Sequence, residues 1–268
     1  SLRNMGVEST ISWKVIRAKD WYWTLDYNFT YNSNKILDLS GVTSDGAPVA
    51  NTGIKIGTDK YLEYQQVGHP MNSFWVFQQA YDKNGKAIEG AVVDRNGDGQ
   101  ITNDDRYYYK SPAAPVTMGL ASRLEYKNWD FSFSLRANLG NYVYDAVSQG
   151  FHNVTPNALW ASTNFLTNKT ASAVADNWAT DETSSTLTDR WVHNASFLKC
   201  DNITLGYSFE NLFKCAKYHG ISGRAYVTAS NVFTITNYDG IDPEVFNGYD
   251  NNVYPRPFSL IVGLNLNF

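Results

Sequence analysis

Residues 257–268, PFSLIVGLNLNF, alternate between two kinds of side chain. One parity holds Phe258, Leu260, Val262, Leu264, Leu266 and Phe268, and the other holds Ser259, Ile261, Gly263, Asn265 and Asn267. Successive side chains of a strand point to opposite faces, so the pattern predicts a strand with one apolar and one largely polar face. The apolar face would cover a core in a soluble sandwich and contact lipid in an outer-membrane barrel. A length of about ten residues suits a tilted membrane-crossing strand.

Residues 21–32 show the same alternation more clearly. One face carries Trp21, Trp23, Leu25, Tyr27, Phe29 and Tyr31, and the other carries Tyr22, Thr24, Asp26, Asn28, Thr30 and Asn32. Aromatic residues at both ends of an apolar face are typical of strands that meet the two membrane interfaces. The alternative is a half-buried sandwich strand. Lipid is favoured because six bulky side chains on every strand would need a very large core.

Five further stretches read as strands, which makes seven in all: residues 7–16, 118–126, 129–140, 197–209 and 221–230. Short or moderate connections alternate with long ones, the short ones at 17–20, 127–128 and 210–220 and the long ones at 33–111, 141–195 and 231–256. Outer-membrane barrels alternate short periplasmic turns with long external loops in this way. The sequence therefore predicts an all-β fold, a transmembrane antiparallel β-barrel with three long extracellular loops. Such barrels have an even number of strands, so we expect a further strand within residues 33–111 or, preferably, before Ser1.

The composition excludes several classes of protein. Aromatic residues make up 15% and charged residues 18%, and the net charge of -4 provides no basic surface for nucleic acid. The four histidines accompany no GxSxG or HExxH motif, so an outer-membrane barrel enzyme is disfavoured and we expect no catalytic residues. Cys200 and Cys215 form no CxxC pair, and parity places Cys200 on the polar face of its strand.

Residues 94–105, DRNGDGQITNDD, match the spacing of a calcium-binding loop. The expected metal ligands are Asp94, Asn96, Asp98, the carbonyl of Gln100, and Asp105. Gly99 permits the sharp turn that lets alternate oxygens converge on one hard cation. Asp105 stands where such loops usually have the longer Glu, and no amphipathic helices flank the loop. The alternative is a turn that binds nothing.

Several motifs together resemble the SusC/RagA family of TonB-dependent outer-membrane transporters. They are RNMGVE (3–8), GHP (68–70), SFW (73–75), DRNGDGQITNDDR (94–106), YKNWDF (126–131), NITLGY (202–207), NVFT (231–234), GIDPE (240–244) and the terminal strand. The series covers nearly the whole chain.

The resemblance implies that residues 1–268 are the carboxy-terminal part of a 22-strand barrel, with the plug domain absent from these residues. It implies a location in the bacterial outer membrane, with lipid around the barrel. The implied partners are the amino-terminal remainder of the barrel and plug, a SusD-like lipoprotein that acts as a lid, and the TonB complex, which acts through the absent part. The expected function is import of glycans, with import of peptides as the alternative.

Tryptophans in the predicted external loops are candidates for binding substrate, because a sugar ring presents apolar CH groups that stack on aromatic rings. They are Trp75, Trp160, Trp178 and Trp191. The alternative for each is that it packs the loops together. A soluble carbohydrate-binding sandwich is a third class, and strands this long with uniformly bulky faces argue against it.

Overall fold

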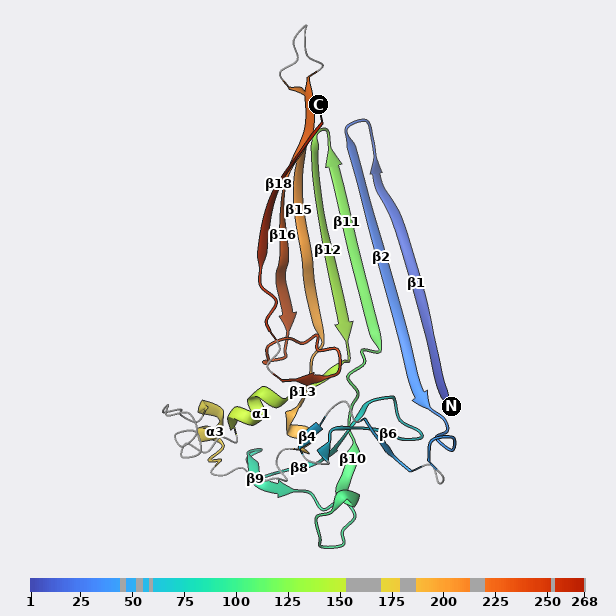
Figure 1. The fold of residues 1–268 in the computed structure, drawn as a ribbon, viewed down its shortest axis with the longest axis vertical. Coiled ribbons are helices and arrows are strands. Elements are labelled where there is room, and N and C mark those ends of the chain that lie inside the picture. Colours follow the sequence, from blue (N-terminus) through green and yellow to red (C-terminus); the bar gives the residue numbers. More distant parts are fainter. Residues whose placement is uncertain are drawn as a thin grey trace.

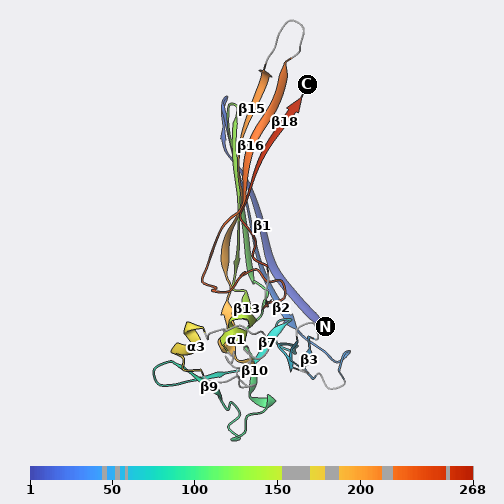
Figure 2. The same ribbon diagram turned by 60° about the vertical axis from the view of Figure 1, so that its left-hand side comes forward.

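The computed structural model describes residues 1–43, 47–51, 55–57, 60–152, 170–178, 187–212, 220–251 and 254–267. A long twisted sheet occupies one part of the molecule, and a body of short strands and helices lies beyond one of its ends (Figures 1 and 2). The short turns of the sheet lie at its opposite end. We call the body of short elements the external body.

The sheet has seven antiparallel strands in the described part of the chain, and these seven lie side by side in the order in which the chain reaches them. They are β1 (Leu2–Arg17), β2 (Trp21–Ile36), β11 (Val116–Tyr126), β12 (Trp129–Leu139), β15 (Phe197–Leu212), β16 (Ile221–Thr236) and β18 (Ser259–Asn267). All seven predicted strands are confirmed. However, β2 and β16 continue to Ile36 and Thr236, so the first and third long connections begin later than predicted. The predicted terminal residue Phe268 lies outside the described residues.

The register gives the sheet one continuous apolar face, because apolar residues lie opposite apolar residues. Leu120 pairs with Tyr27, and Phe131 pairs with Leu124 on one side and Leu205 on the other. Residues directly opposite each other share a face. The apolar face predicted from parity therefore runs across several strands.

Aromatic rings form a band on this face near the short turns. The ring centres of Trp21 and Tyr126 are 4.2 Å apart, and those of Trp129 and Tyr207 are 4.8 Å apart. Trp129 lies opposite Tyr126 in the register, so the two pairs are continuous. This is one of the two interfacial bands that the sequence predicts.

On the opposite face of the sheet, polar side chains from different strands contact one another. Asp130 accepts hydrogen bonds from Arg224, with an Nε–Oδ2 distance of 2.9 Å. The arginine crosses β15 at Gly206, where an added Cβ would meet both side chains. The hydroxyls of Thr204 and Thr228 are 2.9 Å apart on the same face.

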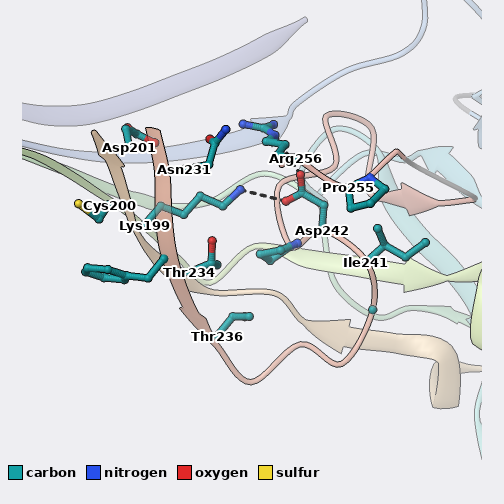
Figure 3. A pocket seen from close by; sticks show the side chains of 13 residues that line it. Lys199, Cys200, Asp201, Asn231, Thr234, Thr236, Ile241, Asp242, Pro255 and Arg256 are labelled. Atoms are coloured by element: carbon teal, nitrogen blue, oxygen red, sulfur yellow. Dashed lines mark hydrogen bonds and ion pairs between the residues drawn. The ribbon is translucent and has the colours of Figure 1, made fainter. Parts of the chain in front are cut away.

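A bulge at Asp201 places Cys200 on the opposite face of β15 from the one predicted by parity. The register shifts between Cys200 and Asn202, so Asp201 has no partner residue on β12 and Cys200 lies opposite Leu135. The inserted residue reverses the parity of everything before it in β15. Cys200 therefore lies on the apolar side, and parity was wrong because sequence alone does not show a bulge. In Figure 3 the side chains of Cys200 and Lys199 leave β15 in opposite directions.

The external body draws on all three long connections. The first supplies β3 (Val49–Ala50), β4 (Lys55–Gly57), β5 (Lys60–Tyr61), β6 (Glu63–Gln65), β7 (Ser73–Phe77), β8 (Gln79–Tyr81), β9 (Ala87–Val92), η1 (Asn103–Asp105) and β10 (Arg106–Tyr108). The second supplies β13 (Tyr142–Asp145), α1 (Ala146–His152), α3 (Ala171–Ala175), η3 (Asp189–Trp191) and β14 (Val192–Asn194), and the third supplies β17 (Tyr249–Asp250). None of these described strands joins the long sheet.

A shared core holds the external body together. Leu62 and Phe74 from the first connection pack in one buried cluster with Tyr144 and Trp191 from the second. The third connection joins them, since β17 pairs with β13 in parallel. No helix in the described residues is long and apolar enough to cross a membrane.

The two faces of β12 predict opposite responses to a charge. Phe133 lies on the apolar face near the middle of the strand, and Ser134 lies on the polar face. We expect Phe133→Arg to lower the free energy of unfolding in lipid vesicles by about 2–4 kcal/mol, as found for arginine near the bilayer midplane. Ser134→Arg is the matched control and should change it by less than about 1 kcal/mol. Urea titration followed by tryptophan fluorescence measures both, and equal losses would contradict a lipid-facing surface.

Candidate functional site

The polar face of the sheet is hollowed between β2, β11 and β12. The cavity has a volume of about 440 Å³ and is lined by Asp26, Asn28, Thr117, Met118, Gly119, Leu120, Ala121, Ser134, Leu135, Arg136, Asn138 and Asp201. Small residues on β11 create the space. At Gly119, for example, an added Cβ would lie 2.6 Å from Nδ2 of Asn28. The hollow therefore presents carboxylate, amide and hydroxyl groups that can exchange hydrogen bonds with a polar solute.

A second feature is an ion network between the sheet and the connection that follows β16. Lys199 Nζ lies 2.9 Å from Asp242 Oδ1 and 3.0 Å from Glu244 Oε2. Arg136 pairs with Glu244 and, at 3.1 Å, with Asp201. Figure 3 shows Lys199 reaching from β15 toward Asp242, beside Arg256. We call these residues, with Arg256, the latch.

Arg256 completes the latch from the far end of the same connection. Its Nε is 3.0 Å from Asp242 Oδ2, and its Nη1 is 2.9 Å from Glu244 Oε2. A cavity of about 200 Å³ lies beside the latch, with Asn231, Thr234 and Thr236 in its wall. Lys199 and Arg136 therefore tie Asp242 and Glu244 to the sheet, and Arg256 ties the end of the connection to the same two carboxylates.

The charge of Glu244 is stabilised within the latch. Burial acts to raise its pKa, but hydrogen bonds from Arg136 and Lys199 outweigh burial and hold the pKa at about 2. Lys199 and Asp242 form the buried pair of the latch, with side chains 8% and 6% exposed. Removing one partner of a buried pair leaves an uncompensated charge, which is strongly destabilising. The motif GIDPE was recognised in the sequence, but its contacts with Lys199 and Arg136 were not. Parity in the sequence places Arg136 on the polar face, but it places Lys199 on the apolar face because the bulge at Asp201 is not visible there.

The structure places three of the four predicted substrate tryptophans within the external body. Trp75 is half-buried, with the guanidinium carbon of Arg106 3.8 Å from its ring centre. Trp178 and Trp191 are 3% and 4% exposed. Trp160 lies outside the described residues. Contact of these rings with sugar stays a prediction, and the three described rings also pack the external body.

Arg106 organises the surroundings of Trp75. Its Nε donates to the carbonyl of Trp75 at 3.0 Å, and its Nη2 donates to the carbonyl of Tyr61 at 3.0 Å. Burial lowers the pKa of Arg106 to about 10, so the side chain stays charged at neutral pH. Its cation lies against the rings of Tyr64 and Trp75, where aromatic faces stabilise it.

The predicted calcium loop is folded around two aspartates. Asp94 accepts hydrogen bonds from the backbone amides of Gly97 and Gly99 at 2.7 and 2.8 Å. Asp105 is buried and accepts from the amides of Thr102 and Arg95, both at 2.8 Å. These amide bonds, the one from Thr102 foremost, lower the pKa of Asp105.

Each of these carboxylate oxygens has a second lone pair, which is available to a hard cation. No group of three or more His, Cys, Asp or Glu side chains in the described part of the chain is arranged to hold a metal ion. Calcium therefore stays a prediction. Asp98 accepts from the amide of Gln100 at 2.8 Å and from Asn96 Nδ2 at 3.0 Å, and the latter contact would have to change on binding.

Glu63 is a buried acid in the external body. Its side chain is 1% exposed, and its Oε2 accepts a hydrogen bond from Asn51 Nδ2 at 2.7 Å. Burial raises the pKa of Glu63 to about 7, and the bond from Asn51 only partly opposes this. Glu63 therefore changes charge near neutral pH, which the sequence does not indicate.

No model of a known protein family matches the sequence. Among curated proteins, the chain is 48% identical over 269 residues to the TonB-dependent receptor SusC of Bacteroides thetaiotaomicron, a match that covers 100% of this chain and 26% of SusC. It is 28% identical to the TonB-dependent receptor P3 of Formosa agariphila, covering 100% of this chain and 29% of that receptor. The chain thus spans between a quarter and a third of the length of these relatives.

Solved structures show the same fold. The chain matches a structure of the RagAB peptide transporter with a TM-score of 0.72 at 21% identity, covering 100% of this chain and 29% of that chain. It matches the RagAB peptide importer in the closed-closed state with a TM-score of 0.71 at 24% identity, covering 100% and 30%. These likenesses confirm the predicted barrel fold class.

The raised pKa of Glu63 predicts a pH-dependent stability of the external body. The native state holds the proton up to about pH 7 and the unfolded state only up to about 4.5, so stability is present below 4.5 and is lost as pH rises to 7. Between pH 5 and 8 we expect a loss of up to roughly 3 kcal/mol. Glu63→Gln should abolish it, whereas Glu89→Gln, the control elsewhere in the external body, should not. Hydrogen exchange of the β6 and β7 amides measures this, and an unchanged pH response in Glu63→Gln would contradict it.

Proposed function

Because the chain belongs to the SusC family of TonB-dependent receptors, we propose that it forms part of the wall and external mouth of an outer-membrane importer. The similarity to SusC extends over the whole chain. The seven-stranded sheet has the apolar face and aromatic band that a lipid-facing wall needs. In this proposal residues 1–268 are the carboxy-terminal part of a larger barrel, and the external body faces away from the cell.

We propose that the imported solute is a glycan. The observation that carries this is the polar hollow, where Asp26, Asn28 and Asn138 surround small residues of β11. Carboxylate and amide groups bond the hydroxyls of a saccharide, whereas an apolar peptide side chain would leave them unpaired. Import of peptides is the alternative, and RagAB, whose fold the chain shares, is described as a peptide transporter. The curated relatives are receptors, and we propose no catalytic role.

The partners follow from the same proposal. A SusD-like lipoprotein would cover the external body, and the TonB complex would act through an amino-terminal part of the importer. The described tryptophans, held by Arg106 and Arg190, give the external body a fixed shape for such a lid. Outer-membrane lipid would surround the apolar face of the sheet.

We also propose that residues 94–105 take calcium, which would be plentiful outside the cell. The support is the ligand spacing, together with the lone pairs that remain on Asp94 and Asp105. The loop ends where β10 begins, so ordering it would fix Arg106 against Trp75. Calcium would serve structure and supply no chemistry.

Binding to the protein purified in mild detergent tests the proposed function. We expect calorimetry against matched panels of oligosaccharides and peptides to show binding of oligosaccharides. Asn28→Ala should weaken it about tenfold, since one hydrogen bond in the hollow is worth about 1.4 kcal/mol. Asn265→Ala, on the polar face of β18 away from the hollow, is the control. Binding of peptides alone would contradict the glycan proposal.

Chelation tests the calcium proposal. We expect a calcium chelator to increase hydrogen exchange in residues 94–106 and leave β11 and β12 unchanged, and added calcium to restore protection. In the Asp94→Asn variant, residues 94–106 should show rapid hydrogen exchange with or without calcium. Asp104→Asn, which alters a neighbouring carboxylate outside the ligand positions, should still respond. Exchange that is the same with chelator and with calcium would mean that the loop binds no calcium.

A further inference from the structure

A cavity in the external body is separate from the polar hollow and has no residue in common with it. Its volume is about 340 Å³, and it is lined by Asp145, Ser148, His152, Ser172, Arg190, Trp191, His193, Asn237 and Asp239. Cavities of this size hold small ligands or single units of larger ones. Its lining comes from the β13–α1 segment, from the α3–β14 segment and from the residues that follow β16.

The floor of the cavity is made of buried polar side chains held in place by neighbours. Asp145 is 3% exposed, and its Oδ1 accepts a hydrogen bond from the amide of Ser148 at 2.8 Å. His152 is 2% exposed, with Nδ1 3.4 Å from Ser172 Oγ and Nε2 3.4 Å from Asp176 Oδ2. Side chains fixed in this way lose little entropy when a ligand binds.

Aromatic contacts fix the same floor. The ring of His152 meets the rings of Trp178 and Trp191 edge-on, with centres 5.0 and 5.2 Å apart. The guanidinium of Arg190 lies 5.3 and 5.1 Å from the same two tryptophan rings and pairs with Asp176. The charge of Arg190 is therefore matched within the wall.

The rim offers hydrogen-bonding groups of several kinds. Ser148, Ser172 and Asn237 are exposed and bring hydroxyl and amide groups, and His193 and Asp239 bring an imidazole and a carboxylate. The carboxylates of Asp145 and Asp239 disfavour an anion, because the charge of Arg190 is already matched. An apolar group would leave most of these polar atoms unpaired, which is costly.

We propose that this cavity binds one neutral hexose unit of an oligosaccharide at the external mouth of the importer. A sugar ring carries hydroxyls around its whole edge, so it can pair with donors and acceptors on every side of the cavity. The substrate class rests on the proposed function. The site rests on the cavity itself.

Saccharide binding to rim variants tests the assignment. The probes are maltotriose, cellotriose and mannotriose, measured by saturation-transfer NMR and calorimetry on the protein in mild detergent. We expect at least one of them to bind, and both Asn237→Ala and Asp239→Asn to weaken its binding tenfold or more. Asn247→Ala is the control, since Asn247 is exposed in the same connection but does not line the cavity.

The outcomes separate this assignment from the proposed function. Trisaccharide binding that is weakened by Asn28→Ala but by neither rim variant would overturn the cavity assignment and leave glycan import standing. Binding weakened by the rim variants but unaffected by Asn28→Ala would support the cavity and not the hollow. If glucosamine or a lysine-containing tripeptide binds at the rim more tightly than a neutral sugar does, the cavity takes an amine. That result would overturn the assignment of a neutral hexose.

Discussion

Backbone hydrogen bonding between antiparallel strands, in a register that keeps apolar residues opposite apolar residues, is the constraint on which the structure depends. A slip of one residue would move every bulky side chain of a strand to the other face. The register holds from β2 through β12, where Leu120, Tyr27, Phe131 and Leu205 share one face. That alternation leaves the opposite face free to carry the polar hollow.

The register shift at Asp201 links the long sheet to the external body. The bulge lets Asp201 and Lys199 both serve the polar side of β15, where Arg136 pairs with Asp201 and with Glu244. Glu244 and Asp242 thereby hold the connection after β16, which carries Asn237 and Asp239 on the cavity rim. The same connection then pairs with β13 through β17. A local feature of one strand thus helps to hold the connection that forms part of the cavity rim in the external body.

Parity predicted the seven strands and the short turns because a strand repeats every two residues and needs no information from elsewhere in the chain. It failed at Cys200, since a bulge is a property of the paired strands. The latch and the cavity also escaped prediction, because their residues come from segments far apart in sequence, such as Lys199 with Asp242 and Asp145 with Arg190. Trp178 and Trp191 were recognised as aromatic residues in a loop, but their burial depends on the packing of that loop.

The orientation of the sheet in the membrane can be measured from the accessibility of spin labels placed one at a time at residues 129–139 of β12 in lipid vesicles, with Cys200 and Cys215 changed to Ala. We expect oxygen, which concentrates in lipid, to reach the labels at odd-numbered residues best, and a water-soluble nickel chelate to reach those at even-numbered residues best, so that both accessibilities vary with a period of two. Equal access of the chelate to both sets would contradict a lipid-facing wall and return the chain to the soluble sandwich class.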